Sequence, residues 1–587
     1  MADWLISIGL HMTLRTQRSN LIMKKQFLIL LTIIGSFNIA HGNQTADTAT
    51  RNLTSYQITS LQVLGQVWGF LKYYHPNVAK GQLNWDSVLI AKIPVFLVAG
   101  NARALNEVVL TWLNELGKVP ACTQCDNTLT DRLSYNFDTA WITHRGFNGE
   151  LVSKLQYILT NRSQGACYYA AYGTTHQIKI INEEAYGSPG FRYPSPDYRL
   201  LTLFRYWNIV NYFSPYKYIT SKKWDSVLTE LIPPFYQAKD ELQYQLNIIK
   251  MIGMLEDGHS TFSGAGWSRQ IRNLIGDYSY LPFSCFIVEG KAVVDLITND
   301  SLCKAQGIAL NDVIVSIDGE TIEERINKYW PFICNASNKE GGLFALCNSF
   351  LFAGNTGNCA ITRLTPQGVT TSLNIERSKS PLPYAPPVPI VWKMLPDNIG
   401  YIDMSELQTR DVDKIMDSLG ATRGIIIDIR NHPNDTWPVI AARLSSHTYL
   451  APRMIYPDLS YPGMYKYYGD RIAGKDQSSP YAGKVVLLVN EHTKSHGEYS
   501  AMALQGAAKT ITIGSTTSGA DGDWTEWIVL PGQFKTRFSG LGVYDLDGTV
   551  AQKKGVNIDI VCKPTIKGLQ QGRDELIEAA IKVINGK

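Results

Sequence analysis

Residues 484–504 constrain the fold of this chain more than any other stretch. The run Val485 to Val489 is short and continuously apolar, as in a buried strand, and the small-residue segment Tyr499 to Leu504 is typical of a helix. Ser495 therefore falls in a turn from strand to helix. There a hydroxyl projects into open space, and unpaired N–H groups at the helix start can stabilise an oxyanion. The pattern favours a serine nucleophile, with a plain helix N-cap as the structural alternative.

An internal repeat organises the first part of the chain. The matched positions are Trp68 and Trp207, Tyr73 and Tyr212, Pro76 and Pro215, and the segments 85–89 and 224–228. Both copies show apolar residues at helical spacing around a proline-containing break, so each predicts a small helical unit with its tryptophans in the core. Only the second copy ends in Asp257-Gly258-His259, whereas the first has Pro120 at the histidine position. His259 is therefore either a cap at a helix C-terminus or a functional histidine.

Length and charge narrow the class of protein. A chain of 587 residues should hold three or four domains. Its formal net charge of +4 comes without a dense block of Lys and Arg, so we expect no nucleic-acid partner. The sequence leaves the oligomeric state open.

The N-terminal segment predicts export. A basic start at Met23, an apolar run from Phe27 to Ile39 and small residues before Asn43 are typical of a secretory signal peptide, with translation beginning at Met23. The apolar run is shorter than the roughly 20 residues that span a bilayer, so no stable membrane anchor is expected. We predict a periplasmic or extracellular protein.

The nine cysteines are too sparse for a disulfide scaffold. Cys122 and Cys125 have the spacing of a redox or zinc motif, but no second CxxC or pair of histidines completes a metal site. A loop disulfide or two plain thiols are the favoured interpretations, and no metal site is predicted.

The middle of the chain changes character. From about Tyr280 to Arg377 the sequence alternates short strands with glycine turns, and residues 307–322 resemble the signature segment of a PDZ domain. Such domains bind extended peptide ends by strand addition, while a β-rich spacer without a binding role is the alternative. The proline-rich segment 381–396 predicts an extended linker.

Beyond the linker, apolar strands alternate with helices, which implies an α/β layered domain. The expected elements are strands at 399–402, 424–428, 485–489 and 510–514 and a closing amphipathic helix near 574–584. Asp428 and Arg430 stand at a strand end, where we expect a structural ion pair.

The motifs of this chain, and their order along the sequence, resemble those of the tail-specific, or carboxyl-terminal-processing, serine peptidase family, in its tricorn-core-like branch. The motifs that carry the resemblance are Asp257-Gly-His259, the PDZ-like segment, Asp428-Ile-Arg-Asn431, Thr493-Lys-Ser495-His-Gly-Glu498, Gly555-Val-Asn-Ile-Asp559 and Gly572-Arg-Asp574. They run from the second repeat to the C-terminus.

With the repeat, this resemblance implies a multidomain α+β protein with duplicated N-terminal helical units, a PDZ-like β-rich domain and a crotonase-like α/β catalytic domain. The expected divisions are an upstream segment and signal peptide at 1–42, the first helical repeat with a β-rich extension at 43–190, the second repeat at 195–270, the PDZ-like domain at 278–380, the linker at 381–396 and the peptidase domain at 397–587.

The family pattern also implies roles for individual residues. Ser495 matches the nucleophile, three positions before Glu498. One branch of the family uses a lysine as base, but the corresponding residue here is Ala520, whereas the tricorn-like branch uses a histidine that matches His259. His496 is a rival base by proximity. The activity implied is cleavage of protein or peptide substrates through an acyl-enzyme, often near a substrate's C-terminus and without any cofactor.

The oxyanion would be held by backbone N–H groups of His496 and of Asn434 or Asp435. Proline at 433 has no N–H to offer.

Two positions depart from the branch's pattern. Gly258 stands where the branch has a serine, and Gln552 stands where it has a glutamate that orients the catalytic network. A glutamine cannot balance the charge of an imidazolium, so Asp257 and Glu498 are further candidates for the orienting role. The alternative function is a catalytically weak or inactive protein that binds peptides or hydrophobic ligands on the same scaffold. An esterase is disfavoured because there is no Gly-x-Ser-x-Gly elbow.

Overall fold

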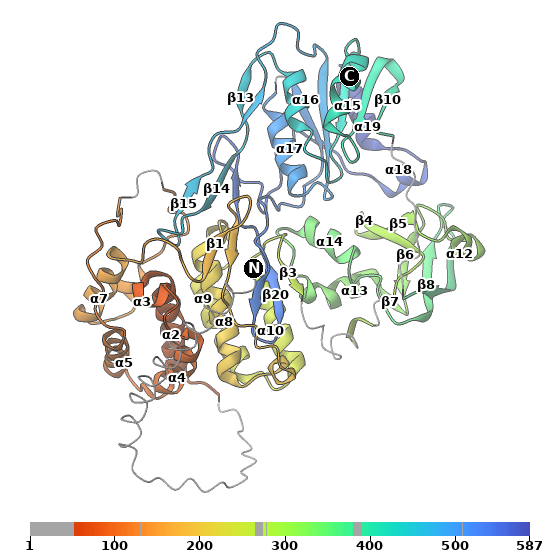
Figure 1. The fold of residues 1–587 in the computed structure, drawn as a ribbon. Coiled ribbons are helices and arrows are strands. Elements are labelled where there is room, and N and C mark those ends of the chain that lie inside the picture. Colours follow the sequence, from red (N-terminus) through yellow and green to blue (C-terminus); the bar gives the residue numbers. More distant parts are fainter. Residues whose placement is uncertain are drawn as a thin grey trace, which may run out of the picture. The chain divides into compact units, whose positions relative to one another are not determined.

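A computed structural model describes residues 52–128, 132–263, 274–276, 279–379, 390–507 and 509–586 (Figure 1). The expected signal peptide and most of the expected linker lie outside these residues. No helix in the described ranges is long and apolar enough to cross a bilayer. From Asn52 onward the chain forms one unit by its contacts.

The two helical repeats fold alike. The first contains α2 (Ser55–Tyr74), α3 (Pro76–Ala79), α4 (Trp85–Val98) and α5 (Ala102–Glu115), and the second contains α8 (Pro196–Phe213), η2 (Lys217–Ile219), α9 (Trp224–Gln237) and α10 (Glu241–Gly253). The indoles of Trp68 and Trp85 each donate to the other's carbonyl oxygen, at 2.9 and 3.0 Å. Trp207 and Trp224 make the same reciprocal pair at 2.9 and 3.0 Å. All four are at most 5% exposed, which confirms the repeat and its tryptophan core.

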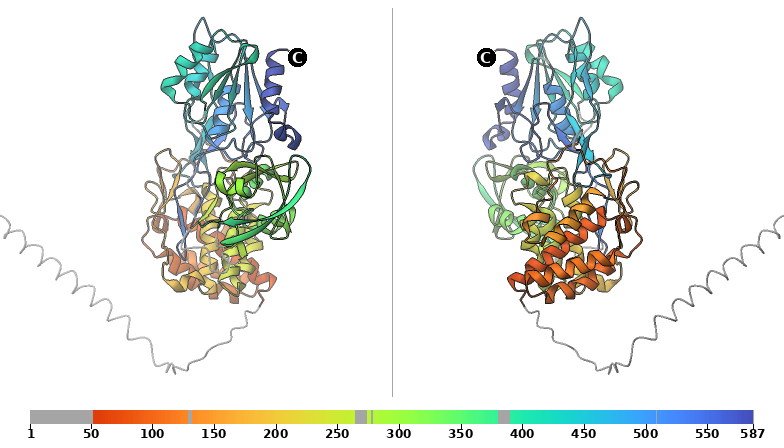
Figure 2. Two further views of the ribbon diagram at one scale, coloured as in Figure 1. Left: turned by 90° about the vertical axis from the view of Figure 1, so that its right-hand side faces the viewer. Right: turned by 90° about the vertical axis from the view of Figure 1, so that its left-hand side faces the viewer.

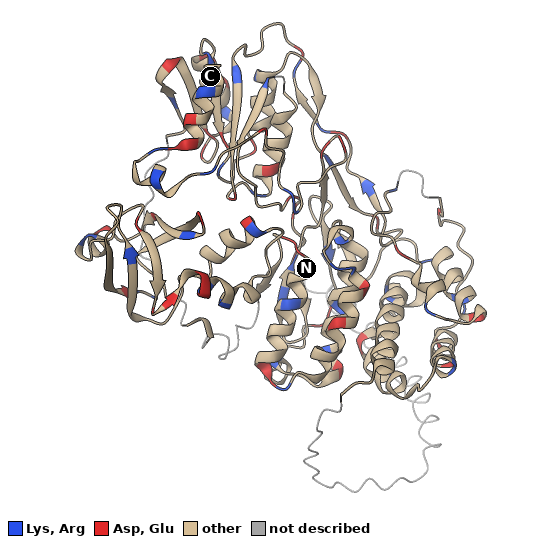
Figure 3. Cartoon of the chain, turned by 180° about the vertical axis from the view of Figure 1, so that it is seen from behind, with Lys and Arg blue, Asp and Glu red and all other residues tan. Residues whose placement is uncertain are grey.

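The repeats pack on each other, with the red-to-orange helices of the first beside the yellow helices of the second (Figure 2), and α2 and α8 are in contact. Asn208 of α8 donates from Nδ2 to the carbonyl of Gly65 at 2.9 Å. A Cβ atom added at Gly69 would lie 1.8 Å from Asn208 Oδ1, so only glycine permits this approach. Arg205 of α8 forms a buried ion pair with Asp86 of α4, which also joins the copies. Elsewhere Lys and Arg are interspersed with Asp and Glu (Figure 3).

An extension follows the first repeat. It contains α6 (Trp141–His144), α7 (Gly149–Thr160), the antiparallel hairpin of β1 (Ala170–Tyr172) and β2 (Ile178–Ile180), and η1 (Pro189–Arg192). The Cys122–Cys125 disulfide is present, as one of the two favoured interpretations predicted. At the hairpin tip Thr175 donates from Oγ1 to Asp523 Oδ2 at 2.5 Å, so this extension reaches the C-terminal part of the chain.

The middle region contains a sheet of order β4-β5-β6-β8-β9, with β7 paired to β6. Its elements are β4 (Phe283–Val288), β5 (Lys291–Ile297), α12 (Asp300–Ala305), β6 (Val313–Ile317), β7 (Glu320–Thr321), α13 (Ile322–Tyr329), η3 (Trp330–Phe332), α14 (Lys339–Cys347), β8 (Gly357–Leu364) and β9 (Thr370–Arg377). The strands were expected, but the three α-helices were not. Their start signals are local: Thr321 and Glu324 form a capping box, and Asn338 accepts from the N–H of Gly341 at 2.8 Å.

The C-terminal region is built on a six-stranded sheet of order β10-β11-β12-β17-β18-β22. Its strands are β10 (Trp392–Leu395), β11 (Ile399–Asp403), β12 (Gly424–Asp428), β17 (Lys484–Val489), β18 (Thr510–Gly514) and β22 (Ile560–Val561), parallel from β11 onward. The helices are α15 (Thr409–Leu419), α16 (Trp437–Leu444), α17 (His496–Gln505), α18 (Ile566–Gln570) and α19 (Glu575–Ile584), and η4 (Pro396–Asn398) precedes β11.

Both faces of this sheet are covered (Figure 1). Ile425 and Ile427 pack in a core with α15, α16 and α17, while Ile426 between them packs in a separate core with α19. Double burial explains why the strands are continuous apolar runs. The α/β layering predicted from the sequence is confirmed.

Three small sheets complete the fold. They contain β13 (Thr448–Leu450) with β16 (Ile472–Gly474); β14 (Arg453–Pro457) with β15 (Tyr465–Tyr467) and β21 (Gly542–Tyr544); and β19 (Ile528–Leu530), β20 (Phe534–Arg537) and β3 (Thr261–Ser263). In the last of these, Thr261 of β3 pairs with Arg537 of β20. Because β3 begins two residues after His259, this pairing fixes the His259 loop against the C-terminal region.

Candidate active site

Ser495 lies in the turn between β17 and α17, as the pattern predicts. Its backbone has φ 54° and ψ −118°, a left-handed conformation that costs free energy for any residue with a Cβ. The N–H of Ser495 donates to the carbonyl of Ala520 at 2.9 Å, which helps to hold this conformation. Strain of this kind is characteristic of functional positions.

Glu498 holds the same turn from inside the protein. Its carboxylate accepts from the backbone N–H groups of Gly519 and Ala520 at 2.8 Å each and of Ser495 at 3.3 Å, and from the hydroxyl of Thr517. Burial raises the pKa of Glu498 to about 7, while these hydrogen bonds act in the opposite direction. Because its acceptor positions are taken by the turn, Glu498 positions the backbone of Ser495 rather than an imidazole.

His259 is buried beside the C-terminal region. Its Nδ1 lies 2.9 Å from Ser539 Oγ, and its ring meets the ring of Trp524 edge-on at 6.2 Å. Helix α10 ends at Gly253, six residues earlier in the chain, so the helix-cap interpretation is wrong. Burial lowers the pKa of His259 to about 3, with further lowering by Lys494, Arg537 and His432. At this lowered pKa the imidazole is uncharged at neutral pH, so one of its ring nitrogens is unprotonated.

One cavity of about 720 Å³ brings Ser495 and His259 together. Other side chains on its walls include His432, Met454, Tyr468, Arg471, His496, Tyr499, Asp521, Trp524, Leu541 and Val543. Thr175, from the hairpin of the first repeat's extension, also lines it. The first repeat is therefore linked to the cavity although its own copy lacks the histidine.

The expected oxyanion groups are only partly brought to this cavity. His496 lines it and is the first residue of α17, so its N–H has no acceptor within the helix. Asn434 and Asp435 are not among its lining residues: the Asn434 side chain donates to the carbonyl of Leu407 at 3.0 Å, and an Asp435 carboxylate oxygen lies 3.5 Å from His496 Nε2. His432, two residues before Asn434, does line the cavity.

Two of the residues considered for orienting His259, Gln552 and Asp257, have different hydrogen-bond partners. Gln552 is 1% exposed and donates from Nε2 to Ser337 Oγ at 3.3 Å, and that hydroxyl also accepts from the N–H of Gly258. Asp257, by contrast, accepts from the N–H of His259 at 2.8 Å and from the hydroxyl of Ser539 at 2.9 Å. Sequence reasoning missed Ser539, which is 280 residues from His259 and carries no local motif.

Lys494 supplies a positive charge next to Ser495. Its Nζ donates to the carbonyl of Gly258 at 2.7 Å. Burial lowers the pKa of Lys494, while the nearby carboxylates of Asp257 and Glu498 act in the opposite direction. Asp257 and Lys494 therefore stabilise each other's charged form.

The position of Gly258 explains why the branch's serine is missing. A Cβ atom at Gly258 would lie 2.4 Å from Ala520 Cβ and 3.0 Å from Ser337 Oγ. We expect Gly258→Ser to lower the free energy of unfolding by about 1–3 kcal/mol through overpacking, and Ala520→Gly in the same chain to recover part of this loss. Thermal unfolding of the two variants and the wild type measures both effects. A Gly258→Ser protein as stable as the wild type would contradict the predicted overlap.

Asp428 and Arg430 form the structural ion pair expected at the end of β12. Their side chains meet at 2.6 Å, and Arg430 also pairs with Asp574 at 2.8 Å. The hydroxyl of Tyr401 donates to Asp428 Oδ2 at 2.9 Å. These contacts tie the sheet to the start of α19 and account for both residues without a chemical role.

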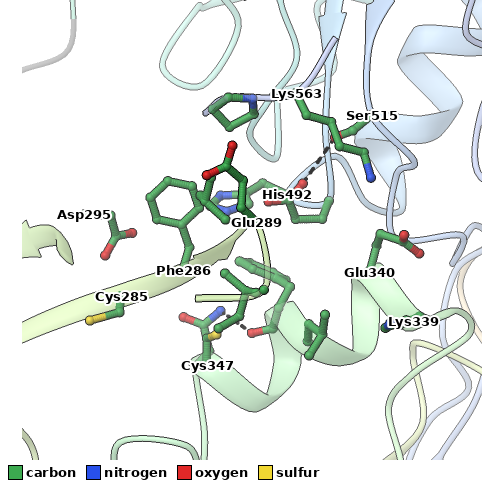
Figure 4. Close-up of a pocket in the computed structure, with 18 of the residues that line it drawn as sticks. Cys285, Phe286, Glu289, Asp295, Lys339, Glu340, Cys347, His492, Ser515 and Lys563 are labelled. Carbon is green, nitrogen blue, oxygen red and sulfur yellow. Dashed lines mark hydrogen bonds between the residues drawn. The ribbon is translucent and has the colours of Figure 1, made fainter. Parts of the chain in front are cut away.

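A second cavity, of about 370 Å³, lies beside β4 and α14 (Figure 4). The C-terminal region forms part of its wall through Glu491, His492, Ser515 and Lys563. The His492 ring lies 4.4 Å from that of Phe344 on α14, measured between centroids. Glu491 and His492 are in the loop that leads from β17 to Ser495, so this loop connects the second cavity with Ser495.

Comparisons with known proteins agree with this architecture. Residues 398–562 match the sequence model of peptidase family S41. Among solved structures, mature CPAF complexed with lactacystin is similar over 67% of this chain and 99% of its own, with 12% identity and a TM-score of 0.51. A CPAF mutant is similar over 66% of this chain and 96% of its own, with 13% identity and a TM-score of 0.51. At these levels of sequence identity, the similarity shows a shared fold and nothing more.

A comparison with curated protein sequences returns no match. The family model covers five strands of the six-stranded sheet, β11 to β22, together with Ser495 and Ser539, and excludes β10, the helical repeats and the middle region. The chain therefore contains a peptidase family S41 domain at residues 398–562.

Proposed function

We propose that this chain is an exported serine endopeptidase that cleaves peptide bonds of protein or peptide substrates, with Ser495 as nucleophile and His259 as general base. One observation carries the proposal: a serine with strained backbone at a helix start shares a cavity with a buried, uncharged histidine. A nucleophile and a base on the walls of one cavity are the minimum that acyl transfer requires.

The proposed reaction has two halves. Nε2 of His259 takes the proton from Ser495 Oγ as that oxygen attacks the substrate carbonyl carbon, and the N–H of His496 stabilises the resulting oxyanion. The protonated imidazole then gives its proton to the leaving amine nitrogen, so the peptide C–N bond breaks and an acyl ester remains on Ser495. A water molecule then attacks this ester while His259 takes one of its protons; the imidazolium returns that proton to Ser495 Oγ as the ester bond breaks, which releases the acid and restores the serine and the neutral histidine.

The middle region supplies a further part of the proposal. We assign residues 278–380 as a PDZ-like domain in which the substrate adds a strand to β4, an edge strand of its sheet, beside the 370 Å³ cavity. A C-terminal peptide end held there would favour cleavage near the end of the substrate. We also assign residues 397–587 as a crotonase-like catalytic domain.

We propose a periplasmic or extracellular location for the mature chain. The sequence pattern before Asn43 supports export. The Cys122–Cys125 disulfide supports it independently, because disulfides persist in oxidising compartments.

Covalent labelling tests the nucleophile directly. The chain from Asn43 onward is incubated with a fluorophosphonate, digested and analysed by mass spectrometry, and casein cleavage is measured before and after labelling. We expect one adduct on Ser495 and loss of casein cleavage in proportion to labelling. Ser418, exposed on α15, is the internal control and should stay unmodified. An unlabelled chain that leaves casein intact would refute the peptidase and favour a binding protein on the same scaffold.

A further inference from the structure

We propose that Ser539 and Asp257 act together to position His259, in the role that an orienting glutamate has in the family and that Gln552 cannot fill here. Both are positioning residues, because they act on the substrate only through the imidazole. This inference rests on the proposed function, in which His259 is the base.

The three side chains form a continuous hydrogen-bonded series. His259 Nδ1 lies 2.9 Å from Ser539 Oγ, and Ser539 Oγ donates to Asp257 Oδ1 at 2.9 Å. The N–H of Ser539 donates to the other carboxylate oxygen, Asp257 Oδ2, at 2.8 Å. His259 is 6% exposed, and Asp257 and Ser539 are fully buried. Hydrogen bonds shielded from water in this way are stronger electrostatically than exposed ones.

Counting hydrogens fixes the direction of each bond. Asp257 accepts from the N–H groups of His259 and Ser539 and lies near the Lys494 cation; burial raises its pKa, and these groups oppose that effect. Ser539 Oγ donates its single hydroxyl hydrogen to Asp257, which in its ionised form can only accept. The oxygen of Ser539 is then left to accept from Nδ1–H of His259. This tautomer leaves Nε2 unprotonated, as a general base requires.

The hydrogen bonds from His259 through Ser539 to Asp257 also offset the free-energy cost of protonating the buried imidazole. When Nε2 takes a proton, a positive charge forms in a buried site near Lys494, Arg537 and His432, all of which disfavour it. The Asp257 carboxylate, linked through the Ser539 hydroxyl, is the negative group in hydrogen-bonded contact with the Nδ1 side of the ring. An ionised partner of this kind stabilises the imidazolium in the transition state.

The fold explains why Ser539 can serve here and Gln552 cannot. Ser539 follows β20 by two residues, and the pairing of β20 with β3 brings it to the loop of His259. A backbone bridge from Ser539 to Trp524 fixes it from the other side. Gln552 instead directs its Nε2 to Ser337, and its Oε1 is buried without a hydrogen-bond partner in the described chain.

Kinetics of three variants test the proposal. We expect Ser539→Ala to lower kcat for a neutral peptide about 10- to 100-fold with little change in KM, because the tautomer and charge balance of the base are affected and the cavity is not. Ser539→Thr keeps a hydroxyl and should recover most of kcat. Gln552→Met is the matched control: it alters a buried side chain of similar size in the same region and should leave kcat within about threefold. Circular dichroism checks that each variant folds.

A second readout does not depend on turnover. Nitrogen-15 spectra of labelled imidazoles give the tautomer of His259, identified as the signal that disappears in His259→Ala. We expect protonation at Nδ1 in the wild type and a shift towards Nε2 in Ser539→Ala. Full kcat in Ser539→Ala, equal losses in Ser539→Ala and Gln552→Met, or an Nε2-protonated wild type would each overturn the proposal. If the wild type cleaves nothing, the proposed function fails, and the spectra alone still decide the positioning of His259.

Discussion

Ser495→Ala is expected to lower kcat for peptide hydrolysis about 10⁴-fold or more while KM changes little. Removing the oxygen that forms the acyl-enzyme removes the covalent route, and only binding and oxyanion stabilisation remain to accelerate attack by water. The substitution also changes the strained turn little, because alanine keeps the Cβ and the backbone N–H that donates to Ala520. Initial rates with a fluorogenic peptide, measured over a range of substrate concentrations, give both constants.

The matched control is Ser418→Ala, which removes an exposed hydroxyl on α15 and should leave the rate unchanged. Burst kinetics add a second check, since an acyl-enzyme that accumulates releases the first product before steady state. A Ser495→Ala protein that keeps a tenth of the wild-type rate would require another nucleophile.

His259→Ala is expected to cause the second large loss, again about 10⁴-fold in kcat, because neither proton transfer can then occur through the imidazole. His496→Ala separates this base from its rival. The His496 ring lies parallel to that of Tyr499 and near Asp435, so we expect its removal to lower kcat less than about 10-fold. His447, an exposed histidine away from the cavity, is the neutral control. Equal losses of kcat in His259→Ala and His496→Ala would contradict the assignment of His259 as the base.

The lowered pKa of His259 predicts how kcat/KM depends on pH. An ordinary histidine becomes protonated below about pH 6.5, which removes it as a base. The lowered pKa of His259, at about 3, keeps Nε2 free at lower pH, so kcat/KM should stay level from about pH 7 to pH 5. Measurements use a peptide without ionisable side chains, and circular dichroism confirms the fold at each pH. A fall centred near pH 6.5 would show that the base is not in this buried environment.

Much of the fold follows from local patterns. The strands of the C-terminal sheet are continuous apolar runs because both of their faces are covered, and the reciprocal indole bonds of Trp68 and Trp85 reappear at Trp207 and Trp224 because the repeat preserves them. The helices of the middle region were missed since short strands and short capped helices give similar apolar runs.

The candidate site was less accessible to sequence reasoning. Ser495 and His259 each stand in a recognisable motif, but Ser539 does not, and only the pairing of β3 with β20 brings it to the imidazole. Asn434 and Asp435 were expected on the cavity wall, yet the loop after β12 places His432 there instead. Contacts between segments so far apart depend on tertiary packing, which no single motif encodes.

The sheet formed by β3, β19 and β20 has a consequence for when activity can arise. Strand β3 is synthesised shortly before the midpoint of the chain and β20 near its end, with the whole middle region between them. Pairing of such high contact order forms late in folding. In a chain still on the ribosome, Ser495 and His259 have therefore not yet come together, and we expect proteolytic activity only after the complete chain has folded.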